Sequence, residues 1–534
     1  MPKWEITCEC DKEDEVLDLI LKNRGIKDQE TFFNPPPISY WVKNLSSDFK
    51  SNLKKSKEIV EKAISDSRPI IIYGDYDVDG ICATAILFTT IKNELGYDKV
   101  YYFIPNRFRH GYGLSKEGIH ECEKPNALFI TVDSGITNIE EAEYLKKLNH
   151  QVVITDHHQQ KSKLPEADCI LWDDQIVGAT VAWLLSKALG SKNSTNIALC
   201  GLATVTDLQP IIGFNRTLVK ESLKILNNNL PAGFCKLLSN GTNEITSYEL
   251  GWVLGPRLNA SGRLGDASMS LNLLIESDIK KAEKIADSLN EINKQRQDKT
   301  LEMYELAATV FDDDPPTIII SGHDDYHEGI IGLVAAKLKQ RFHRPSIVIT
   351  TSGDVAKGSA RSISGVNIIE LLRNYESLFM SLGGHPMAAG FSIKKESISK
   401  LKEELSKVKV KEEILQEILI IDAKVSCKFI TLKTLASLEK LRPYGVGNRM
   451  PVFATLGLGV TSVNRVGKEK QHLSLRIFDG SVFHKAIYFN YPENYPYITI
   501  GDKVDLAYTL KANKFNGKIY LDLTVKDLRL SKRV

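Results

Sequence analysis

The sequence predicts an α/β protein made of two α/β domains joined by a long helix, with a small β-barrel at the C-terminal end. Three patterns indicate this fold class. Short apolar runs alternate with helical patterns in two stretches, a long amphipathic segment lies between the stretches, and short alternating runs fill the C-terminal part. Strands that alternate with helices form mainly parallel sheets. Several short strands separated by turn residues indicate a barrel or a sandwich.

Residues 1–45 are expected to form an N-terminal helical and loop region that ends around NPPPISYW. A helical pattern from Asn52 to Asp66 then leads into RPIIIYGDYDVDG, whose β-branched run is too short for a buried helix. Two further runs, ALFITVDSGIT and HQVVITDHHQ, flank a helical pattern over 138–148. All three runs end in acidic residues, and ligands of parallel sheets bind beyond the carboxyl ends of the strands. We therefore predict a first α/β domain over 46–275 with its site at those ends.

The segment 276–310 is predicted to be one long connecting helix. Ser277 or Asp278 is its expected cap, and the apolar face consists of Ile279, Ala282, Ile285, Leu289 and Ile292. The pattern PPTIIISGHDDYHEG restarts α/β alternation, so a second α/β domain is expected over 311–412. The alternating runs that follow place the β-barrel within 413–534.

Acidic and imidazole groups follow the predicted strands of the first domain. They are Asp75, Asp77 and Asp79 in DYDVDG, Asp133 in VDSG, Asp156, His157 and His158 in TDHH, and Asp207 in VTDLQP. DYDVDG matches the opening of a calcium-binding EF-hand loop, but Ile86 occupies the position of the bidentate Glu and a strand precedes the motif. One carboxylate at a strand end is usually a cap or turn residue, whereas several on one rim repel each other unless cations neutralise them.

Carboxylate oxygens combined with imidazole suit Mn²⁺ or Mg²⁺, and the imidazole favours Mn²⁺. Two such ions can stabilise the attacking and leaving oxygens of a phosphoryl displacement. The number of acidic side chains favours two ions over one. The sequence therefore predicts two Mn²⁺ ions, with Mg²⁺ as the alternative.

The ordered motifs DYDVDG, VDSG, TDHH and the later Asp resemble the four motifs of the DHH phosphoesterase superfamily. This resemblance implies that the first domain is a DHH domain. It also implies that Asp77 and Asp79 bind one metal each, that Asp133 bridges both, and that His157 and Asp207 complete the second site. Asp75, Asp156 and His158 are then inner ligands or groups that orient the ligands through hydrogen bonds.

The segment GGHPMAAG, from Gly383 to Gly390, is a second motif. Taken alone it fits a tight turn before a strand, or a backbone that approaches a phosphate closely with His385 near its oxygens. It resembles the signature of the DHH-associated domain, which identifies the second α/β domain. The resemblance implies that Gly384 and His385 bind the substrate and that His385 contacts the phosphate being cleaved.

Five further segments are similar to the RecJ family of this superfamily: NRFRHGYGLS, GPRLNASGRLGDA, HEGIIGLVAAKL, GSARSISG and LRPYGVGNRMPVF. The resemblance extends over nearly the whole chain from about residue 70. It implies that Arg107, Ser359 and Arg361 bind a 5′ phosphate, since guanidinium forks match its oxygen edges. Arg257 and Arg263 are implied to hold the strand beside the metals, with Asn259 shaping that loop. Any one of these arginines could equally form a surface ion pair.

The C-terminal stretch from Pro451 to Val534 has a net charge of +6, against −4 for the rest of the chain. A basic module suits binding to a polyanion, although a solvated lysine-rich surface has the same composition. The resemblance implies an OB-fold, which binds single strands through basic grooves and stacking aromatics. Its candidate contacts are Lys468, Lys470, Lys485, Lys511 and Lys514 with Phe483, Tyr488 and Phe515, and the aromatics could equally belong to the core.

Three features depart from the family pattern. The stretch between His158 and Asp207 is shorter, VTDLQP replaces an Ala-Asp-Val-Val-Pro run, and Tyr326 and Glu328 stand where the family commonly has Trp and Pro. These departures put the shape of the strand channel and the rate in question more than the chemistry, because every expected metal ligand is present.

The expected function is that of a single-stranded-DNA-specific 5′→3′ exonuclease that releases 5′-mononucleotides, acting in DNA repair and recombination. One alternative is a DHH phosphodiesterase of short oligonucleotides or cyclic dinucleotides. The other is a non-catalytic replication scaffold, although such relatives tend to lose metal ligands.

The remaining expectations concern location and partners. The eight cysteines are scattered without a Cys-x-x-Cys pair, which suits reduced thiols in the cytoplasm. No apolar run reaches the roughly 20 residues of a membrane span, and MPKWEITCECDKEDEV lacks the apolar stretch of a signal peptide. The expected partners are single-stranded DNA, a single-strand-binding protein and a helicase, and the chain is expected to be a monomer.

Overall fold

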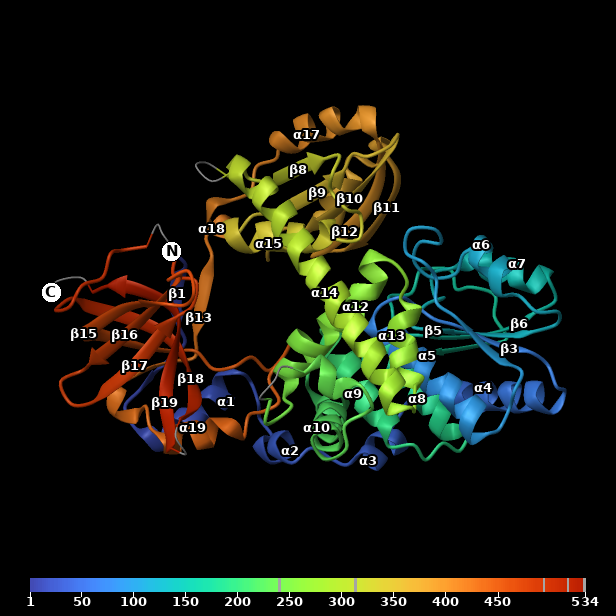
Figure 1. Cartoon of the computed structure of the whole chain (residues 1–534), viewed down its shortest axis with the longest axis horizontal. Coiled ribbons are helices and arrows are strands. Elements are labelled where there is room, and N and C mark those ends of the chain that lie inside the picture. The colour runs from blue at the N-terminus through green and yellow to red at the C-terminus, as the bar shows by residue number, and fades with distance from the viewer. Residues whose placement is uncertain (239–241, 312–314, 493–494, 516–517, 532–534) are drawn as a thin grey trace. The chain divides into compact units, whose positions relative to one another are not determined.

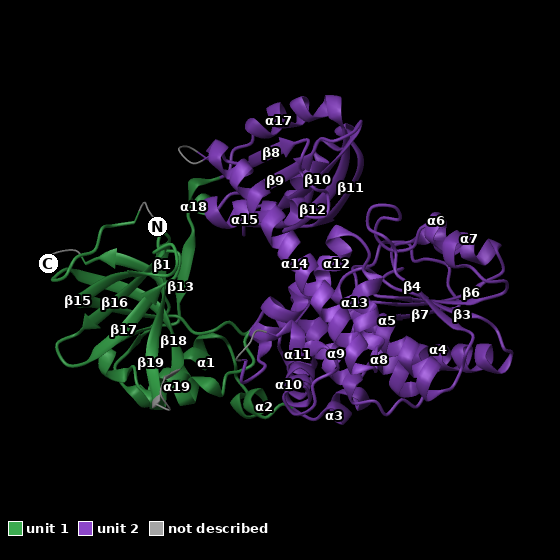
Figure 2. Cartoon of the chain, viewed as in Figure 1, with its two compact units in different colours: residues 1–35, 411–444, 448–534 green, residues 36–410, 445–447 purple. Residues whose placement is uncertain are grey.

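The computed structural model describes residues 1–238, 242–311, 315–492, 495–515 and 518–531. The chain forms two compact units, shown in different colours in Figure 2. Unit 1 contains residues 1–35, 411–444 and 448–534, and unit 2 contains residues 36–410 and 445–447. Figure 1 labels the elements of each unit. Among the described residues, no helix combines the length and apolarity that crossing a membrane requires.

Unit 2 begins with a five-stranded parallel sheet whose order is β4-β3-β5-β6-β7. The strands are β3 (Ile70–Tyr73), β4 (Val100–Phe103), β5 (Leu128–Val132), β6 (Gln151–Asp156) and β7 (Cys169–Trp172). Strands β3 and β5 are buried along their whole length, as expected for a parallel sheet covered on both faces. The chain moves from β3 to β4 on one side and then to β5 on the other, so the strand order reverses between β3 and β5. Ligands bind at such switch points.

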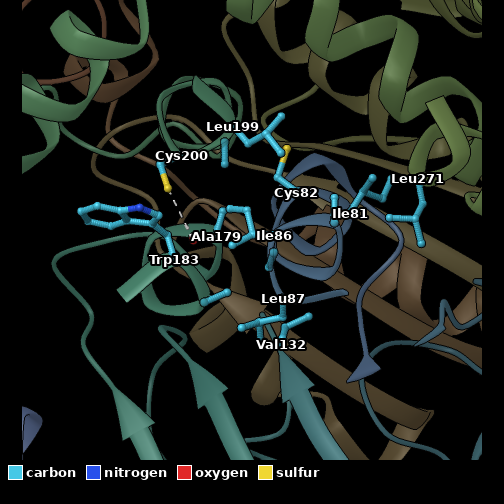
Figure 3. Packing of buried hydrophobic residues seen from close by; sticks show 14 of the residues in the cluster. Ile81, Cys82, Ile86, Leu87, Val132, Ala179, Trp183, Leu199, Cys200 and Leu271 are labelled. Carbon is cyan, nitrogen blue, oxygen red and sulfur yellow. Dashed lines mark hydrogen bonds between the residues drawn. The ribbon is translucent and has the colours of Figure 1, made fainter. Parts of the chain in front are cut away.

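Helices cover this sheet and form the largest core. They include α3 (Ile38–Lys43), α4 (Ser47–Ser65), α5 (Val78–Thr89), α6 (Lys116–Cys122), α7 (Ile139–Lys147), α8 (Gly178–Ala188), α9 (Thr195–Thr206), α10 (Gly213–Asn228), α11 (Phe234–Leu237), α12 (Gly255–Leu264) and α13 (Ser268–Ile275). Helix α5 is buried on all sides from Val78 to Leu87, and it packs against α8 and α9. Figure 3 shows its Ile86 in the same cluster as Trp183 of α8 and Leu199 of α9. This all-round burial fixes the position of the α5 N-terminus beside the sheet.

The long helix expected over 276–310 is α14 (Ile279–Ala308). Asp278 caps it, since its side chain accepts a hydrogen bond from the Lys281 N–H. Ala282 and Leu289 of the expected apolar face are buried, but Ile279 in the first turn is exposed. The first turn therefore lies outside the packed part of the stripe, which is covered where the helix packs against α11, α12, α13 and α15 (Ile331–Phe342).

The second α/β region of unit 2 has a mixed five-stranded sheet in the order β11-β12-β10-β9-β8. Strands β8 (Ile319–His323) and β9 (Ser346–Thr350) are parallel and are joined through α15 (Ile331–Phe342). Strands β10 (Val355–Arg361), β11 (Phe379–His385) and β12 (Ala388–Lys394) continue the sheet in antiparallel register. Helices α16 (Ile368–Arg373) and α17 (Ile398–Ser406) complete this region.

Unit 1 contains the expected β-barrel. Strands β15 (Phe453–Val466), β16 (His472–Phe478), β17 (Phe483–Tyr488), β19 (Lys518–Leu530) and β18 (Lys503–Phe515) follow each other around it, and the pairing of β15 with β16 closes it. Tyr488 is only 8% exposed and lies in the core cluster, so its prediction as a nucleic-acid contact is wrong. Phe483 is 49% exposed, and the guanidinium carbon of Arg476 lies 4.9 Å from its ring centroid. The side chains of Lys514 and Phe515 lie outside the described residues.

The first 35 residues belong to unit 1 rather than forming a body of their own. Strand β1 (Lys3–Ile6) pairs with β13 (Ile418–Ile421), and β2 (Glu9–Cys10) pairs with β14 (Ala423–Val425), which itself pairs with β15. Helix α1 (Val16–Asn23) contributes to the same core as α19 (Leu432–Glu439). The short helices α2 (Gln29–Phe33) and α18 (Glu412–Leu415) complete the unit. Sequence periodicity carries no information on pairing between strands this far apart.

Candidate metal and phosphate site

The acidic groups of the first sheet meet at its switch point. Asp75 and Asp77 follow β3, Asp133 follows β5 directly, and Asp156 is the last residue of β6. These strands are neighbours and run parallel, so their carboxyl ends share one edge. Asp207 reaches the same edge from the C-terminal end of α9.

The start of α5 fixes two of these carboxylates. Asp77 is the N-cap of α5, and its Oδ1 accepts hydrogen bonds from the backbone N–H groups of Asp79 and Gly80 at 2.9 and 3.2 Å. Asp79 accepts hydrogen bonds of 2.7 Å from the N–H groups of Gly178 and Ala179 in the first turn of α8. Helix N-termini stabilise negative charge, so both carboxylates are held in place without a cationic side chain.

Asp133 lies in left-handed backbone, with φ at +57°. Asp and Asn tolerate this conformation better than most residues. A Cβ atom at position 178 would come within 2.6 Å of the Asp133 Cβ, so glycine is required there for the α8 N-terminus to approach Asp133. The Asp133 carboxylate is 2% exposed and lies 3.1 Å from His157 Nε2.

His157 joins three carboxylates that come from different segments. Its Nε2 lies 3.1 Å from Asp133 Oδ1, 3.4 Å from Asp79 Oδ2 and 3.9 Å from Asp207 Oδ2. Its Nδ1 lies 3.4 Å from Nε2 of Gln209, two residues beyond Asp207. The side chain of Gln209, which sequence reasoning did not select, is thus placed to orient the imidazole ring.

Asp156 orients the DHH segment. Its Oδ1 accepts hydrogen bonds from the backbone N–H groups of His157 and His158 at 2.7 and 3.1 Å, and it lies 2.8 Å from His158 Nδ1. Burial opposes ionisation of Asp156, but these hydrogen bonds outweigh it and lower the pKa of the carboxyl group. Burial likewise opposes the charged form of His158, yet its bond to Asp156 raises the pKa of His158 to about 9. His158 also lies 3.0 Å from the hydroxyl of Tyr112, another residue that the sequence did not single out.

The cluster has an excess of negative charge that the protein itself does not neutralise. Burial, followed by repulsion from neighbouring carboxylates, raises the pKa of Asp75, Asp133 and Asp207. Burial raises the pKa of Asp79 as well, although His157 opposes the shift. Asp75 Oδ1, Asp133 Oδ1 and His157 Nε2 are buried without a hydrogen-bond partner. Buried polar atoms normally have partners, so these atoms point to a cation as the missing partner.

Three sets of ligand atoms lie close enough to hold metal ions. The sets are Asp75, Asp77 and Asp133; Asp79, His157 and Asp207; and Asp133, His157 and His158, with the atoms of each set within 4.8 Å of one another. Asp133 belongs to two of these sets, and the first two share no residue. The first set offers only carboxylate oxygens and the second adds one imidazole, and both compositions fit Mn²⁺ or Mg²⁺. The residues present therefore fit divalent cations.

Four arginines from separate segments form a second cluster: Arg107, Arg263, Arg296 and Arg361. Burial, and then repulsion from the other three, lowers the pKa of Arg263 to about 9. Arg107 has its guanidinium carbon 4.3 Å from the ring centroid of Tyr76, which lies between Asp75 and Asp77 in sequence. The Nε atoms of Arg107 and Arg296 are buried without a hydrogen-bond partner. A buried group of like positive charges with free donors fits a phosphate.

Sequence reasoning missed Arg296. It lies on α14, where Asn293 and Thr300 are each 3% exposed on a face that should be apolar. The signal available in the sequence was the occurrence of polar residues at helical spacing along a face predicted to be apolar.

The second sheet supplies Ser359 and Arg361 from β10. Arg361 donates a hydrogen bond of 3.1 Å to the hydroxyl of Ser359 and one of 2.8 Å to the carbonyl of Ala360. A Cβ atom on Gly332, at the start of α15, would come within 2.9 Å of Arg361 Nη2 and 3.0 Å of Ser359 Oγ. The backbone of α15 therefore packs directly on these two side chains, which sequence reasoning did not foresee.

Arg257 and Asn259 connect helices. Arg257 donates from Nε to Asn290 Oδ1 of α14 at 2.9 Å and from Nη1 to the Val253 carbonyl at 2.8 Å. Asn259 Oδ1 accepts a hydrogen bond of 3.2 Å from the Val78 N–H at the start of α5. Asn259 thus links α12 to the metal-site loop, and contact of either residue with a substrate stays a prediction.

Gly384 and His385 lie at the tip of the β11–β12 hairpin. Gly384 has φ at +150°, and an added Cβ would collide with the carbonyl oxygen of Ala388, so the turn requires glycine. His385 is exposed and makes no hydrogen bond or ion pair within the part of the chain that the structure describes. Its contact with a phosphate stays a prediction.

Three family models match successive parts of the chain. The DHH family N-terminal domain matches residues 69–204, the DHHA1 domain matches residues 315–411, and the RecJ OB domain matches residues 421–527. Together with the acidic and imidazole groups at the switch point, these matches define a protein of the DHH class with a metal-binding α/β domain. The order of the three domains agrees with the fold class that the sequence predicts.

Comparison with named relatives identifies the family within the DHH class. The single-stranded-DNA-specific exonuclease RecJ of Thermus thermophilus is 30% identical over 89% of this chain and 71% of its own length. RecJ of Bacillus subtilis is 31% identical over 90% of this chain and 64% of its own length. A crystal structure of T. thermophilus RecJ in complex with Mn²⁺ superposes with a TM-score of 0.83 at 25% identity, covering 100% of this chain and 80% of that one. The chain belongs to the RecJ family.

Proposed function

We propose that this protein is a single-stranded-DNA-specific exonuclease that degrades strands from the 5′ end and releases 5′-mononucleotides in DNA repair and recombination. The observation that carries the proposal is that the carboxylate cluster and the arginine cluster lie next to each other, and that each holds an excess of charge of one sign. The guanidinium of Arg107 lies over the ring of Tyr76. In the sequence, Tyr76 lies between Asp75 and Asp77 of the cation-binding cluster. Groups suited to a terminal phosphate and groups suited to divalent cations are thereby connected through one loop.

Asp75, Asp77 and Asp133 would hold one cation, and Asp79, His157 and Asp207 would hold the other; Asp133 also belongs to a third set, with His157 and His158. Two bound Mn²⁺ ions, or Mg²⁺ in their place, supply a nucleophilic water near neutral pH and neutralise charge on the phosphate. The N-termini of α5 and α8 hold Asp77 and Asp79 in fixed positions for this task. His158 is held by its bond to Asp156, and its Nδ1 lies 3.9 Å from Asp133 Oδ1.

The arginine cluster would bind the 5′ phosphate. Arg107, Arg361 and Ser359 offer donors to the phosphate oxygens, and Arg263 and Arg296 add positive charge behind them. If the terminal phosphate is bound here, the next phosphodiester is the one presented to the carboxylate cluster. Each cleavage would then release one nucleotide.

The barrel would bind the strand beyond the cleaved end. Phe483, stacked on Phe478 with ring centroids 4.3 Å apart and covered by Arg476, offers an exposed ring for a base. Lys485, on the same strand as Phe483, is the nearest candidate for a backbone phosphate. The chain is proposed to work as a cytoplasmic monomer, with a single-strand-binding protein and a helicase as partners.

The test uses single-stranded oligonucleotides of 5 and 40 nucleotides labelled at the 3′ end, with Mn²⁺ or Mg²⁺. We expect the ladder of products to shorten from the 5′ end, the long strand to be degraded at least as well as the short one, and duplex to be resistant. A 3′-labelled RNA of the same sequence measures the preference for DNA. Faster cleavage of the short oligonucleotide than of the long one, or products that shorten from the 3′ end, would contradict the proposal.

A further inference from the structure

A pocket of about 660 Å³ lies in unit 2, and two residues of its lining, Phe108 and Leu264, directly follow Arg107 and Arg263 of the arginine cluster in sequence. Its walls include Phe108, Lys299 of α14, the run Tyr326–Glu328 and Lys357 of β10. Thr350, at the carboxyl end of the parallel strand β9, also lines it. The carboxyl ends of parallel strands are the usual ligand side of an α/β sheet, and the volume is typical of small-molecule sites.

Lys357 of the pocket lies on the same strand as two of the proposed phosphate-binding residues. Lys357, Ser359 and Arg361 alternate along β10 and therefore share one face of the strand. Two residues along a strand span about 6.6 Å, which is close to the distance from a 5′ phosphate to its own base. A nucleotide whose phosphate lies at Ser359 and Arg361 can therefore place its base beside Lys357.

The backbone at Gly329 packs closely against two neighbouring segments. An added Cβ on Gly329 would collide with the carbonyl oxygen of Arg263 and lie 3.2 Å from the ring of Phe108. The run Tyr326–Glu328, which lines the pocket, is therefore followed directly by a backbone segment packed against the Arg263 carbonyl and the ring of Phe108.

The pocket walls offer stacking surfaces and polar groups. Phe108 and His327 have ring centroids 5.7 Å apart at an interplanar angle of 89°. His327 Nδ1 accepts a hydrogen bond of 3.1 Å from the Gly329 N–H, so the neutral ring carries its proton on Nε2, which can donate to a ligand. The Glu328 carboxylate makes no hydrogen bond or ion pair with any other described residue. Burial raises the pKa of this carboxyl group, and the positive charges of Lys357 and Arg107 oppose the shift. A half-buried carboxylate without a partner next to a donor is an arrangement that recognises a ligand edge.

We propose that this pocket, the terminal-base pocket, receives the base of the 5′-terminal nucleotide and that Glu328 makes it favour guanine over thymine. The inference rests on the proposed exonuclease function. Guanine presents N1–H and N2–H side by side, so one carboxylate can accept both hydrogen bonds, while His327 Nε2–H faces the neighbouring O6 acceptor. Thymine presents a single N3–H between two carbonyl oxygens, which repel a carboxylate.

The first test measures hydrolysis of 5′-phosphorylated strands that differ only in the terminal base, with guanine, adenine, cytosine, thymine or an abasic site. We expect KM for the guanine end to be about tenfold lower than for the thymine end, which corresponds to one charge-assisted hydrogen bond. The value of kcat is expected to differ less than twofold. In Glu328→Gln the difference in KM should shrink to within about twofold, because KM for the guanine strand rises and KM for the thymine strand falls once the carboxylate no longer repels the thymine carbonyl oxygens.

Glu302→Gln is the matched control, because Glu302 lines the same pocket from α14. This variant should keep the preference for guanine. Equal KM values for all five ends, survival of the preference in Glu328→Gln, or its loss in Glu302→Gln would each overturn the assignment.

A second test does not depend on hydrolysis. Titration calorimetry in EDTA compares 5′-dGMP with 5′-TMP, and we expect about tenfold tighter binding of dGMP by the wild type and equal binding by Glu328→Gln. A protein that hydrolyses none of the strands but shows this binding difference contradicts the exonuclease proposal and supports the pocket. A protein that hydrolyses all strands and binds both nucleotides equally contradicts the pocket alone.

Discussion

The two charged clusters of unit 2 are built in opposite ways. The carboxylates are on short side chains attached to strand ends and helix termini, and backbone N–H groups hold Asp77 and Asp79. The arginines reach their cluster on long side chains from a loop, from α12, from α14 and from β10. Within each cluster the like-charged side chains repel one another, and a ligand of opposite charge would neutralise them.

This difference determines how each cluster responds to repulsion between its own like charges. The carboxylate positions are set by the backbone, so like charges stay together even when the cations are absent. The arginines have several rotatable bonds and can move apart, so a bound phosphate would hold their donors in one arrangement. We therefore expect substitutions in the acidic cluster to abolish chemistry, and substitutions in the arginine cluster to weaken binding.

The largest expected effect comes from Asp133→Asn. Asn keeps the left-handed backbone of this position but removes the charge shared by two ligand sets. Hydrolysis of single-stranded DNA should fall by at least about 10²–10³-fold, because the stabilisation of transition-state charge is lost. In EDTA the melting temperature should not fall, since repulsion within the cluster is relieved, and the increase caused by Mn²⁺ should disappear. Asp287→Asn, an exposed carboxylate on α14, is the control and should change neither.

The next largest effect is expected from Arg361→Gln. Removal of one guanidinium from the proposed phosphate site should raise KM for a 5′-phosphorylated strand by about 10- to 100-fold, the worth of charge-assisted hydrogen bonds. The kcat value and the cleavage of a 5′-hydroxyl strand should change little. Arg373→Gln, on an exposed arginine at the end of α16, serves as the control. A drop in kcat equal to that of Asp133→Asn would show that the two clusters do not have separate tasks.

Gly332→Ala is expected to have a smaller effect, which weakens substrate binding without lowering the stability of the fold. The added Cβ would push Arg361 Nη2 and Ser359 Oγ, both mobile side-chain ends, out of place. KM for the 5′-phosphorylated strand should rise by about three- to tenfold, a fraction of the loss expected from deleting the guanidinium. Stability should stay equal or rise by up to about 0.5–1 kcal/mol, because alanine favours the helix. Gly322→Ala is the control, because its added Cβ would meet the nearest atoms at 3.6 Å. Equal effects of the two variants on KM would contradict the packing of α15 on the phosphate site.

The smallest effect concerns the two ligands in the absence of DNA. At about ten times the dissociation constant, Mn²⁺ and inorganic phosphate should each stabilise the protein by about 1.4 kcal/mol, an increase of a few degrees in melting temperature. The two increases should add, because the clusters bind different ligands. Differential scanning fluorimetry at matched ionic strength, with chloride in place of phosphate, measures both. In Arg263→Met the increase from phosphate should shrink and the increase from Mn²⁺ should remain, whereas loss of both would show that the clusters act as one.

Much of the fold followed from local patterns. The β-branched runs before Asp75 and Asp133 are strands, and the amphipathic run that begins after Asp278 is one helix. Their periodicity is set by side-chain burial within a few residues, which a sequence displays directly. The same holds for the alternating runs of the barrel.

Other features were beyond local patterns. The pairing of β1 with β13 joins segments from the two ends of the chain, and Tyr488 proved to be a core residue rather than a nucleic-acid contact. An aromatic residue on a strand reads the same whether its face is covered or exposed. Arg296 and Gly332 gained their places only through contacts with distant segments.

The sequence by itself determined which residues can hold cations, because an acidic group at the end of each strand is a local feature and parallel strands end at one edge. The tertiary structure alone decided that the order of strands reverses between β3 and β5, that four arginines converge, and that Glu328 lines a pocket beside them. The physical reason is the range of the interactions. Strand and helix formation depends on neighbours in sequence, whereas long side chains from separate elements meet only after those elements have packed.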